Sequence, residues 1–163
     1  MSDERPLPPD EKAIAEAEKR AIPVLDAWMV AFNAMDIMEQ KKTMHFPHFR
    51  LASGKMNRWE FEEMGEAFDA RRKANFKNME WDRSEWSRRN VVQCSDEKIH
   101  VDTVFTRYRA DGSVISVNQS LYVLKNPERF PLNALTCGNP LRHFRMINYA
   151  GFSISRMGKR TFR

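Results

Sequence analysis

The sequence predicts a single α+β domain, in which helices from the first half pack on an antiparallel sheet from the second half. Its 163 residues suit one hydrophobic core, because single domains cluster near roughly 100–150 residues. Hydrophobic residues make up 42% of the chain and charged residues 30%, which is the composition of a globular protein. Apolar residues recur with a helical period up to about residue 78 and with a period of two from Trp81 onward. Helices followed by strands are typical of the α+β class.

The N-terminal segment predicts a long amphipathic helix with a break. Residues 10–34 are rich in Ala, Glu and Lys, and apolar side chains such as Val24 and Trp28 recur every three or four positions. Proline has no backbone N–H and is tolerated best in the first turn of a helix. We therefore expect a short helix to about Ala21 and a main helix that starts at Pro23.

Two further helices and a β-ribbon follow. Asp36 is expected to cap a short helix, and the period of residues 60–78 predicts a longer one. Between them, Pro47 blocks helix formation and Gly54 marks a turn. Residues 45–59 are therefore predicted to form a short β-ribbon.

The second half of the chain predicts an antiparallel meander of three strands. Their expected ranges are about 85–94, 99–108 and 114–125. A three-residue loop, with Gly112 in the left-handed conformation, would join the last two strands. Without a bulge, this register places His100 and Asp102 on the same face as Ser120 and Tyr122.

The formal net charge of +5 is concentrated near the C-terminus. Residues 127–163 contain seven Lys or Arg residues and one Glu, whereas residues 1–126 contain 20 basic and 21 acidic residues. The basic segment also carries aromatic side chains, a composition found in nucleic-acid-binding proteins, but it matches no binding motif. A nonspecific basic appendage is favoured, and we do not expect nucleic acid as a partner.

Several function classes lack their sequence signatures. No apolar run approaches the roughly 18–20 residues that cross a bilayer, so no membrane partner is expected and the cytoplasm is the expected location. The chain has no phosphate-binding glycine loop and no zinc-protease motif. Its two cysteines, Cys94 and Cys137, form no disulfide or metal-binding pattern. We therefore expect neither a cofactor nor a metal site.

Three segments resemble the SnoaL-like branch of the nuclear transport factor 2-like (NTF2-like) superfamily. They are VLDAWMVAFNAMD at 24–36, HFPHFRLASG at 45–54 and HVDTVFTRYRADGSVISVNQSLYVL at 100–124. The resemblance covers roughly residues 20–125 and implies an NTF2-like cone, with three helices packed on a strongly curved antiparallel sheet. We accordingly expect a disordered arm at 1–10, the NTF2-like domain at 11–126, and an atypical basic extension at 127–163 that does not match the superfamily.

The resemblance implies a fold more specifically than a function, because this superfamily hosts isomerases, dehydratases, cyclases, ligand carriers and catalytically silent dimerisation modules. The positions that match the functional residues of ketosteroid isomerases hold Trp28, Ala52 and Val104, so that activity is not expected. Dehydratase-like members use His and Asp on the cavity wall. This leaves His100 as a candidate acid–base group and Asp102 as the residue that orients it. The alternative is that both lie on a polar surface or a dimer face.

Aromatic and basic residues are the candidates for ligand binding in the expected cavity. Large rings suit an apolar, ring-containing ligand, and an arginine beside a histidine could hold a carboxylate or an enolate. The candidates are Trp28, His48, Arg50, Trp59, Trp81, Trp86 and Tyr122. The alternative is that the rings fill the cone.

The sequence thus predicts a protein that binds a small apolar or aromatic molecule and forms a homodimer through the outer face of its sheet. Any reaction is expected to be cofactor-independent proton transfer, such as dehydration, isomerisation or cyclisation. Arg50 or Tyr122 would then stabilise developing oxyanion charge. A non-catalytic dimerisation or scaffold module, with its cone filled by side chains, is the alternative function.

Overall fold

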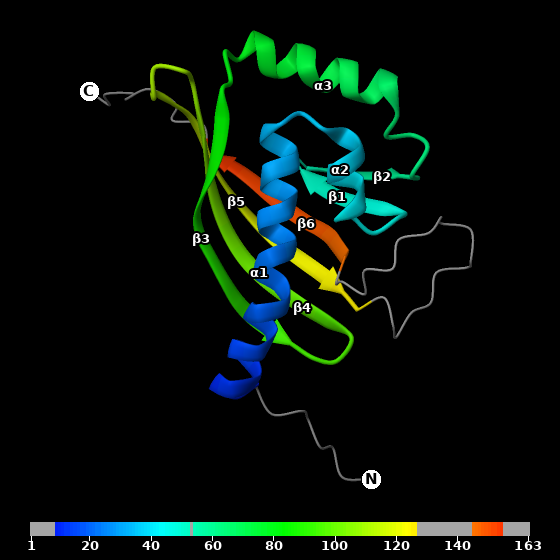
Figure 1. Ribbon diagram of the computed structural model, residues 1–163, viewed down its shortest axis with the longest axis vertical. Helices are drawn as coiled ribbons and strands as arrows, with labels where there is room; N and C mark the ends of the chain where they lie inside the picture. The colour runs from blue at the N-terminus through cyan, green and yellow to red at the C-terminus, as the bar shows by residue number, and fades with distance from the viewer. Residues whose placement is uncertain (1–8, 53, 127–144, 155–163) are drawn as a thin grey trace.

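The computed structural model of the chain describes residues 9–52, 54–126 and 145–154. These residues form three helices and a six-stranded sheet (Figure 1). The helices are α1 (Glu11–Asn33), α2 (Ile37–Lys42) and α3 (Glu66–Asn78). The strands, in spatial order, are β2 (Lys55–Trp59), β1 (His48–Ala52), β6 (Arg145–Ile154), β5 (Val114–Lys125), β4 (Lys98–Tyr108) and β3 (Arg83–Cys94). The predicted α+β class is confirmed.

Helix α1 runs without a break across one face of the curved sheet, which we call the inner face (Figure 1). Asp10 caps the helix by accepting a hydrogen bond from the Ala13 amide at 2.7 Å. The predicted break at Pro23 is wrong. Pro23 lies on the exposed side of the helix, while Ala21 and Leu25 are buried. Because the buried stripe continues past the proline, packing on the sheet outweighs the one backbone hydrogen bond that proline cannot make. None of the described helices is long and apolar enough to cross a membrane.

The predicted short helix and β-ribbon are confirmed. Asp36 caps α2 by accepting hydrogen bonds from two amides of the first turn, each at 3.0 Å. Strands β1 and β2 pair in antiparallel fashion, and Gly54 between them has a φ of 72°, a conformation that glycine adopts without strain. Helix α3 begins at Glu66 rather than near residue 60, because the chain before it turns and the backbone of Gly65 is extended.

The predicted meander is also confirmed, but its register is wrong beyond the second hairpin. Gly112 has a φ of 82°, as the predicted loop requires, and Tyr108 pairs with Val114. The next pair is Arg107 with Ser116, so one residue of β5 forms a bulge. An extra residue in one strand moves every later side chain of that strand to the opposite face.

This bulge decides which side chains face α1. Tyr122 pairs with Val101, and both are buried on the inner face. His100 and Asp102 alternate with these buried positions of β4 and lie on the opposite side of the sheet, which we call the outer face. Ser120 is likewise buried on the inner face. The inner face therefore combines Tyr122 and Ser120 with Val101 of β4, and not with His100 and Asp102 as predicted.

Strand β6 lies inside the sheet, between β1 and β5, although it belongs to the segment expected to be an extension. Its Met146 is fully buried. The Met146 amide donates a hydrogen bond to the Thr43 carbonyl, and its carbonyl accepts one from the His45 amide, both at 3.0 Å. The strand thus joins the β-ribbon to the meander. Most of the predicted N-terminal arm and the rest of the basic segment lie outside the described residues.

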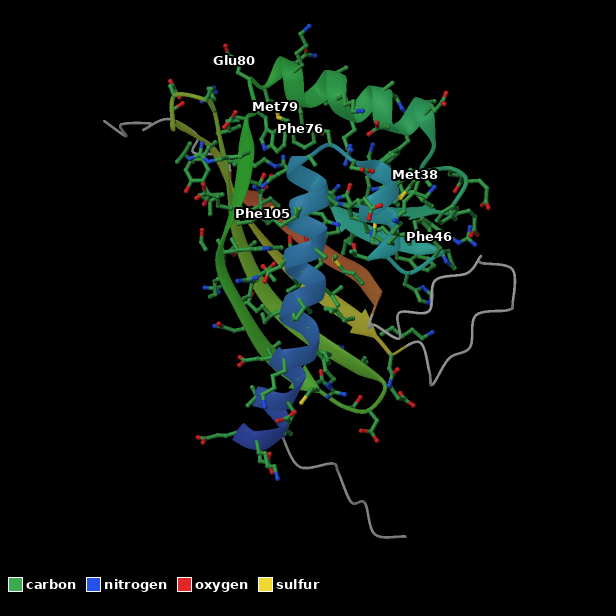
Figure 2. The ribbon with its side chains drawn as sticks, in the orientation of Figure 1. Met38, Phe46, Phe76, Met79, Glu80 and Phe105 are labelled. Atoms are coloured by element: carbon green, nitrogen blue, oxygen red, sulfur yellow. The ribbon has the colours of Figure 1, made fainter. Side chains whose placement is uncertain are left out.

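Aromatic rings dominate the core between α1, α3 and the inner face of the sheet. Trp28 stacks on Phe32 with ring centroids 4.9 Å apart. Phe32 also meets Phe76 of α3 at 5.4 Å and Trp81 at 5.6 Å. Figure 2 shows Phe76 between α3 and the end of α1, with Phe105 on the sheet. Ring contacts thus hold α3 over one end of α1 and shape the space beneath it.

Candidate functional site

A pocket of about 90 Å³ lies between the inner face of the sheet and the surrounding helices. Its aromatic lining comprises Trp28, Phe32, Trp59, Phe68, Phe105 and Tyr122. Its other polar or charged lining residues are Gln40, His48, Arg50, Arg72, Arg107 and Ser120. A concave, mostly apolar space with a few convergent polar groups is the usual form of a small-molecule site. The core rings therefore leave a cavity, and this cavity is the candidate site.

The structure brings most of the predicted ligand-binding residues to this pocket. Those that line it are Trp28, His48, Arg50, Trp59 and Tyr122. The other two tryptophans are not among the lining residues. Trp86 packs against Trp28, with ring centroids 6.0 Å apart, and Trp81 donates a hydrogen bond to the Ser84 hydroxyl at 3.0 Å. Trp81 and Trp86 therefore support the wall of the pocket from behind.

The predicted catalytic pair lies away from the pocket. His100 pairs with Val123 and Asp102 with Leu121, and neither residue of the pair lines the pocket. Instead, Asp102 forms an ion pair with Arg88 of β3 at 2.8 Å. The bulge in β5 is the physical reason, because it exchanges the side chains that share a face with β4. The register on which the catalytic hypothesis depended is thus not the register of the structure.

Sequence reasoning did not select Arg107, which lines the pocket from β4. Its guanidinium carbon lies 5.0 Å from the ring centroid of Phe76 and 5.6 Å from that of Phe105. Burial, and then the nearby charge of Arg50, lower the pKa of Arg107 to about 10. One sign of this position could have been found in the sequence. Arg107 is the basic residue on a face of β4 that otherwise holds Ile, Val, Thr and Phe.

Two other groups in the pocket are held in their neutral forms at pH 7. Burial raises the pKa of Tyr122 to about 12, although the positive charges of Arg50 and Arg107 act in the opposite direction. Burial, and then the charge of Arg50, lower the pKa of His48 to about 4. The pocket therefore offers a protonated phenol and a neutral imidazole beside cationic guanidinium groups.

The lowered pKa of His48 predicts that stability depends on pH. In the unfolded chain this imidazole has its ordinary pKa of 6.5, and in the folded chain a pKa of about 4. Between these values the unfolded state binds more protons, so the free energy of unfolding falls as the pH falls. Protonation of this imidazole in the unfolded chain lowers the free energy of unfolding by about 2 kcal/mol between pH 7 and pH 5.

We expect His48→Gln to remove this contribution, as measured by urea unfolding at the two pH values. The matched control is His100→Gln, because His100 is a partly exposed imidazole on the outer face. This control should keep most of the pH dependence. An identical difference between pH 7 and pH 5 in the wild type and in His48→Gln would contradict the prediction.

Both the sequence and the structure of this chain are similar to those of known proteins. The sequence matches the family described as NTF2-like protein (DUF6841) over residues 17–129. No curated protein matches the sequence. A ketosteroid isomerase-like protein from Erwinia carotovora atroseptica superposes with a TM-score of 0.53 at 18% identity, over 90% of this chain and 99% of that chain.

Two other solved structures share the fold. An NTF-2 like protein of unknown function from Shewanella oneidensis has a TM-score of 0.53 at 12% identity, over 82% of this chain and 97% of that chain. A protein from Catenulispora acidiphila, in complex with S-DNPA, has a TM-score of 0.54 at 13% identity, over 85% of this chain and 92% of that chain. At such identities the likeness concerns the fold alone.

The family match covers more than half of the chain and includes α2, α3 and the whole meander. The similar structures have the same fold of helices on a curved sheet. Both findings confirm the resemblance carried by the three sequence segments. The chain therefore belongs to the NTF2-like family.

Proposed function

We propose that the protein binds a small, ring-containing apolar molecule in the pocket beneath α1 and α3. The observation that carries this proposal is the lining itself, in which Trp28 and Trp59 share one partly open pocket with Arg50 and Tyr122. Aromatic walls supply area for an apolar ring, and a few polar groups fix its orientation. The structure of the Catenulispora acidiphila protein, in complex with S-DNPA, supports the use of this fold as a ligand site.

The lining supports binding more directly than catalysis. A general base works best when its pKa is near the working pH, whereas the pKa of His48 is about 4. Tyr122 remains a protonated donor, which suits recognition of an acceptor group. Because His100 and Asp102 lie on the outer face, we assign neither of them a role in the pocket.

Native mass spectrometry of the full chain, isolated from its own host, tests the proposal. We expect a folded species that carries the extra mass of one small molecule, which denaturation releases. The variant Ser120→Leu adds bulk to a buried lining residue and should lose the extra mass. The matched control is Gln119→Leu, because the adjacent side chain is exposed on the outer face. Far-UV circular dichroism verifies that both variants fold.

Two results would count against binding in this pocket. The first is a wild-type protein that carries no extra mass. The second is an extra mass that Ser120→Leu retains at the wild-type level, since that molecule would then bind elsewhere.

Apolar side chains on the outer face favour homodimerisation as a second candidate function. Val117 has 37% of its surface exposed, and Val104 and Leu121 are only partly buried. Apolar side chains that gather on an exposed sheet face mark protein–protein contacts. The same native mass spectrum reads the oligomeric state, so a species of twice the chain mass supports this candidate and a monomer argues against it.

A further inference from the structure

The pocket contains positive charge that the described residues do not neutralise. Arg50, Arg72 and Arg107 line it, whereas no Asp or Glu does. Arg72 is compensated, because it forms an ion pair with Asp69 at 2.7 Å and donates a hydrogen bond to Gln40 at 2.5 Å. The side chains of Arg50 and Arg107 form no ion pair or hydrogen bond within the described ranges. Two uncompensated guanidinium groups therefore face one small space.

Arg107 is the more unusual of the two, because its side chain is only partly exposed, whereas Arg50 is exposed. The Arg107 Nε is buried and has no hydrogen-bond partner in the described part of the chain. The rings of Phe76 and Phe105 lie close enough for cation–π contacts, but these contacts provide no acceptor for the N–H groups. Buried charges are normally paired, and the neighbouring charge of Arg50 adds repulsion. An anion in the pocket would pair with both guanidinium groups.

Tyr122 adds a hydrogen-bond donor to the same space. The residue is 1% exposed, and its hydroxyl makes no hydrogen bond to another described residue. Burial keeps the phenol protonated, since its pKa is about 12. The neutral imidazole of His48 adds no charge at pH 7. Two guanidinium groups and a phenol that share one pocket favour a group that only accepts hydrogen bonds.

We propose that the ligand is a small monocarboxylate, which Arg50 and Arg107 bind together with the Tyr122 hydroxyl. This inference rests on the proposed function and specifies the chemical class of the ligand. A carboxylate is planar and matches the fork of an arginine, while the apolar part of the ligand would lie against Trp28. The volume of about 90 Å³ is smaller than the roughly 150 Å³ of an engineered cavity that binds benzene. The part of the ligand that enters the pocket is thus no larger than one ring.

Benzoate and benzamide form the pair of probes that tests this inference, because they share a ring and differ in charge. Their dissociation constants at pH 7 can be measured by titration calorimetry and by tryptophan fluorescence, since Trp28 and Trp59 line the pocket. We expect wild-type protein to bind benzoate at least about tenfold more tightly than benzamide. Arg107→Met and Arg50→Gln should each bring this ratio close to one.

The matched control is Arg88→Gln, because Arg88 is a basic residue of the outer face that pairs with Asp102. It should keep the wild-type ratio. Arg107→Met should fold, since it replaces an unpaired charge with an apolar side chain of similar length, and a thermal transition verifies this. Arg50→Gln keeps the test valid if Arg107→Met does not fold, because Arg50 is exposed.

Four results would overturn the inference. They are absence of benzoate binding, equal affinity for benzoate and benzamide, a preference for benzoate that survives both pocket variants, and displacement of benzoate by an equal concentration of inorganic phosphate. The proposed function has its own test. It fails when the protein isolated from its own host carries no small molecule in native mass spectrometry.

Discussion

A chain that ends after Asn126 is expected to lose its cooperative unfolding transition. The shortened chain contains the whole segment, residues 20–125, that resembles the superfamily, but it lacks β6, which lies between β1 and β5. Without β6, the β-ribbon has no strand that connects it to the meander, and β5 has an unpaired edge. Unpaired, apolar strand edges promote aggregation. Thermal unfolding followed by circular dichroism should show a broad, featureless change where the full chain gives a sharp transition.

A single substitution isolates the contribution of β6 from the effect of deletion. Met146 is fully buried and lines the pocket, so Met146→Ala should lower the free energy of unfolding by about 2–5 kcal/mol. The matched control is Met56→Ala, because Met56 lies on β2 with 56% of its surface exposed. The control should change stability by about 0.5 kcal/mol or less. A shortened chain that unfolds with the midpoint of the full chain would contradict the role given to β6.

Trp28→Ala is the second substitution with a large expected effect, a loss of about 3–5 kcal/mol in the free energy of unfolding. Trp28 is 8% exposed and stacks on Phe32. Its ring also contacts Tyr122 and Trp86, with centroids 5.9 Å and 6.0 Å away. Val30→Ala is the control on the same helix, because Val30 is 70% exposed, and chemical unfolding of both variants gives the comparison.

Added indole provides a sharper test of the same site. Trp28 lines the pocket, so its removal adds the volume of an indole to a cavity that is already present. Apolar cavities of this kind bind aromatic molecules, and binding to the folded state raises stability by about 2.7 kcal/mol at 100 times the dissociation constant. Indole should therefore raise the melting temperature of Trp28→Ala and leave Val30→Ala unchanged. An unchanged melting temperature in Trp28→Ala would mean that the pocket collapses when its wall is removed.

Local sequence patterns predicted the elements of the meander but not the orientation of β5. The turn at Gly112 could be predicted because its left-handed conformation favours glycine. The bulge beside it could not, since Val114 and Ile115 are both apolar and give no sign of which residue is extra. Ser120 was predicted to share a face with His100, but it is buried beside the pocket on the opposite face. This one displaced register moved His100 away from the candidate site.

The candidate site was predictable where residue type alone is informative. Trp28 and Trp59 were selected because large rings tend to wall apolar cavities, and Arg50 because an arginine beside a histidine could hold a carboxylate or an enolate. Arg107 could not be selected in the same way. Its importance depends on burial and on the absence of an acidic partner in the described pocket lining, and both are properties of the assembled fold. Strand β6 was missed for a similar reason, because pairing between distant strands leaves no local pattern.

The position of β6 also sets when the pocket can form during synthesis of the protein. Its Met146 contributes to the pocket lining beside Trp28 of α1, which the ribosome makes more than a hundred residues earlier. Contacts across so long a stretch of chain form late, because closing a long loop is entropically unfavourable. A nascent chain therefore has its helices and the meander before it has a complete binding site. Ligand recognition begins only when β6 has left the ribosome and entered the sheet.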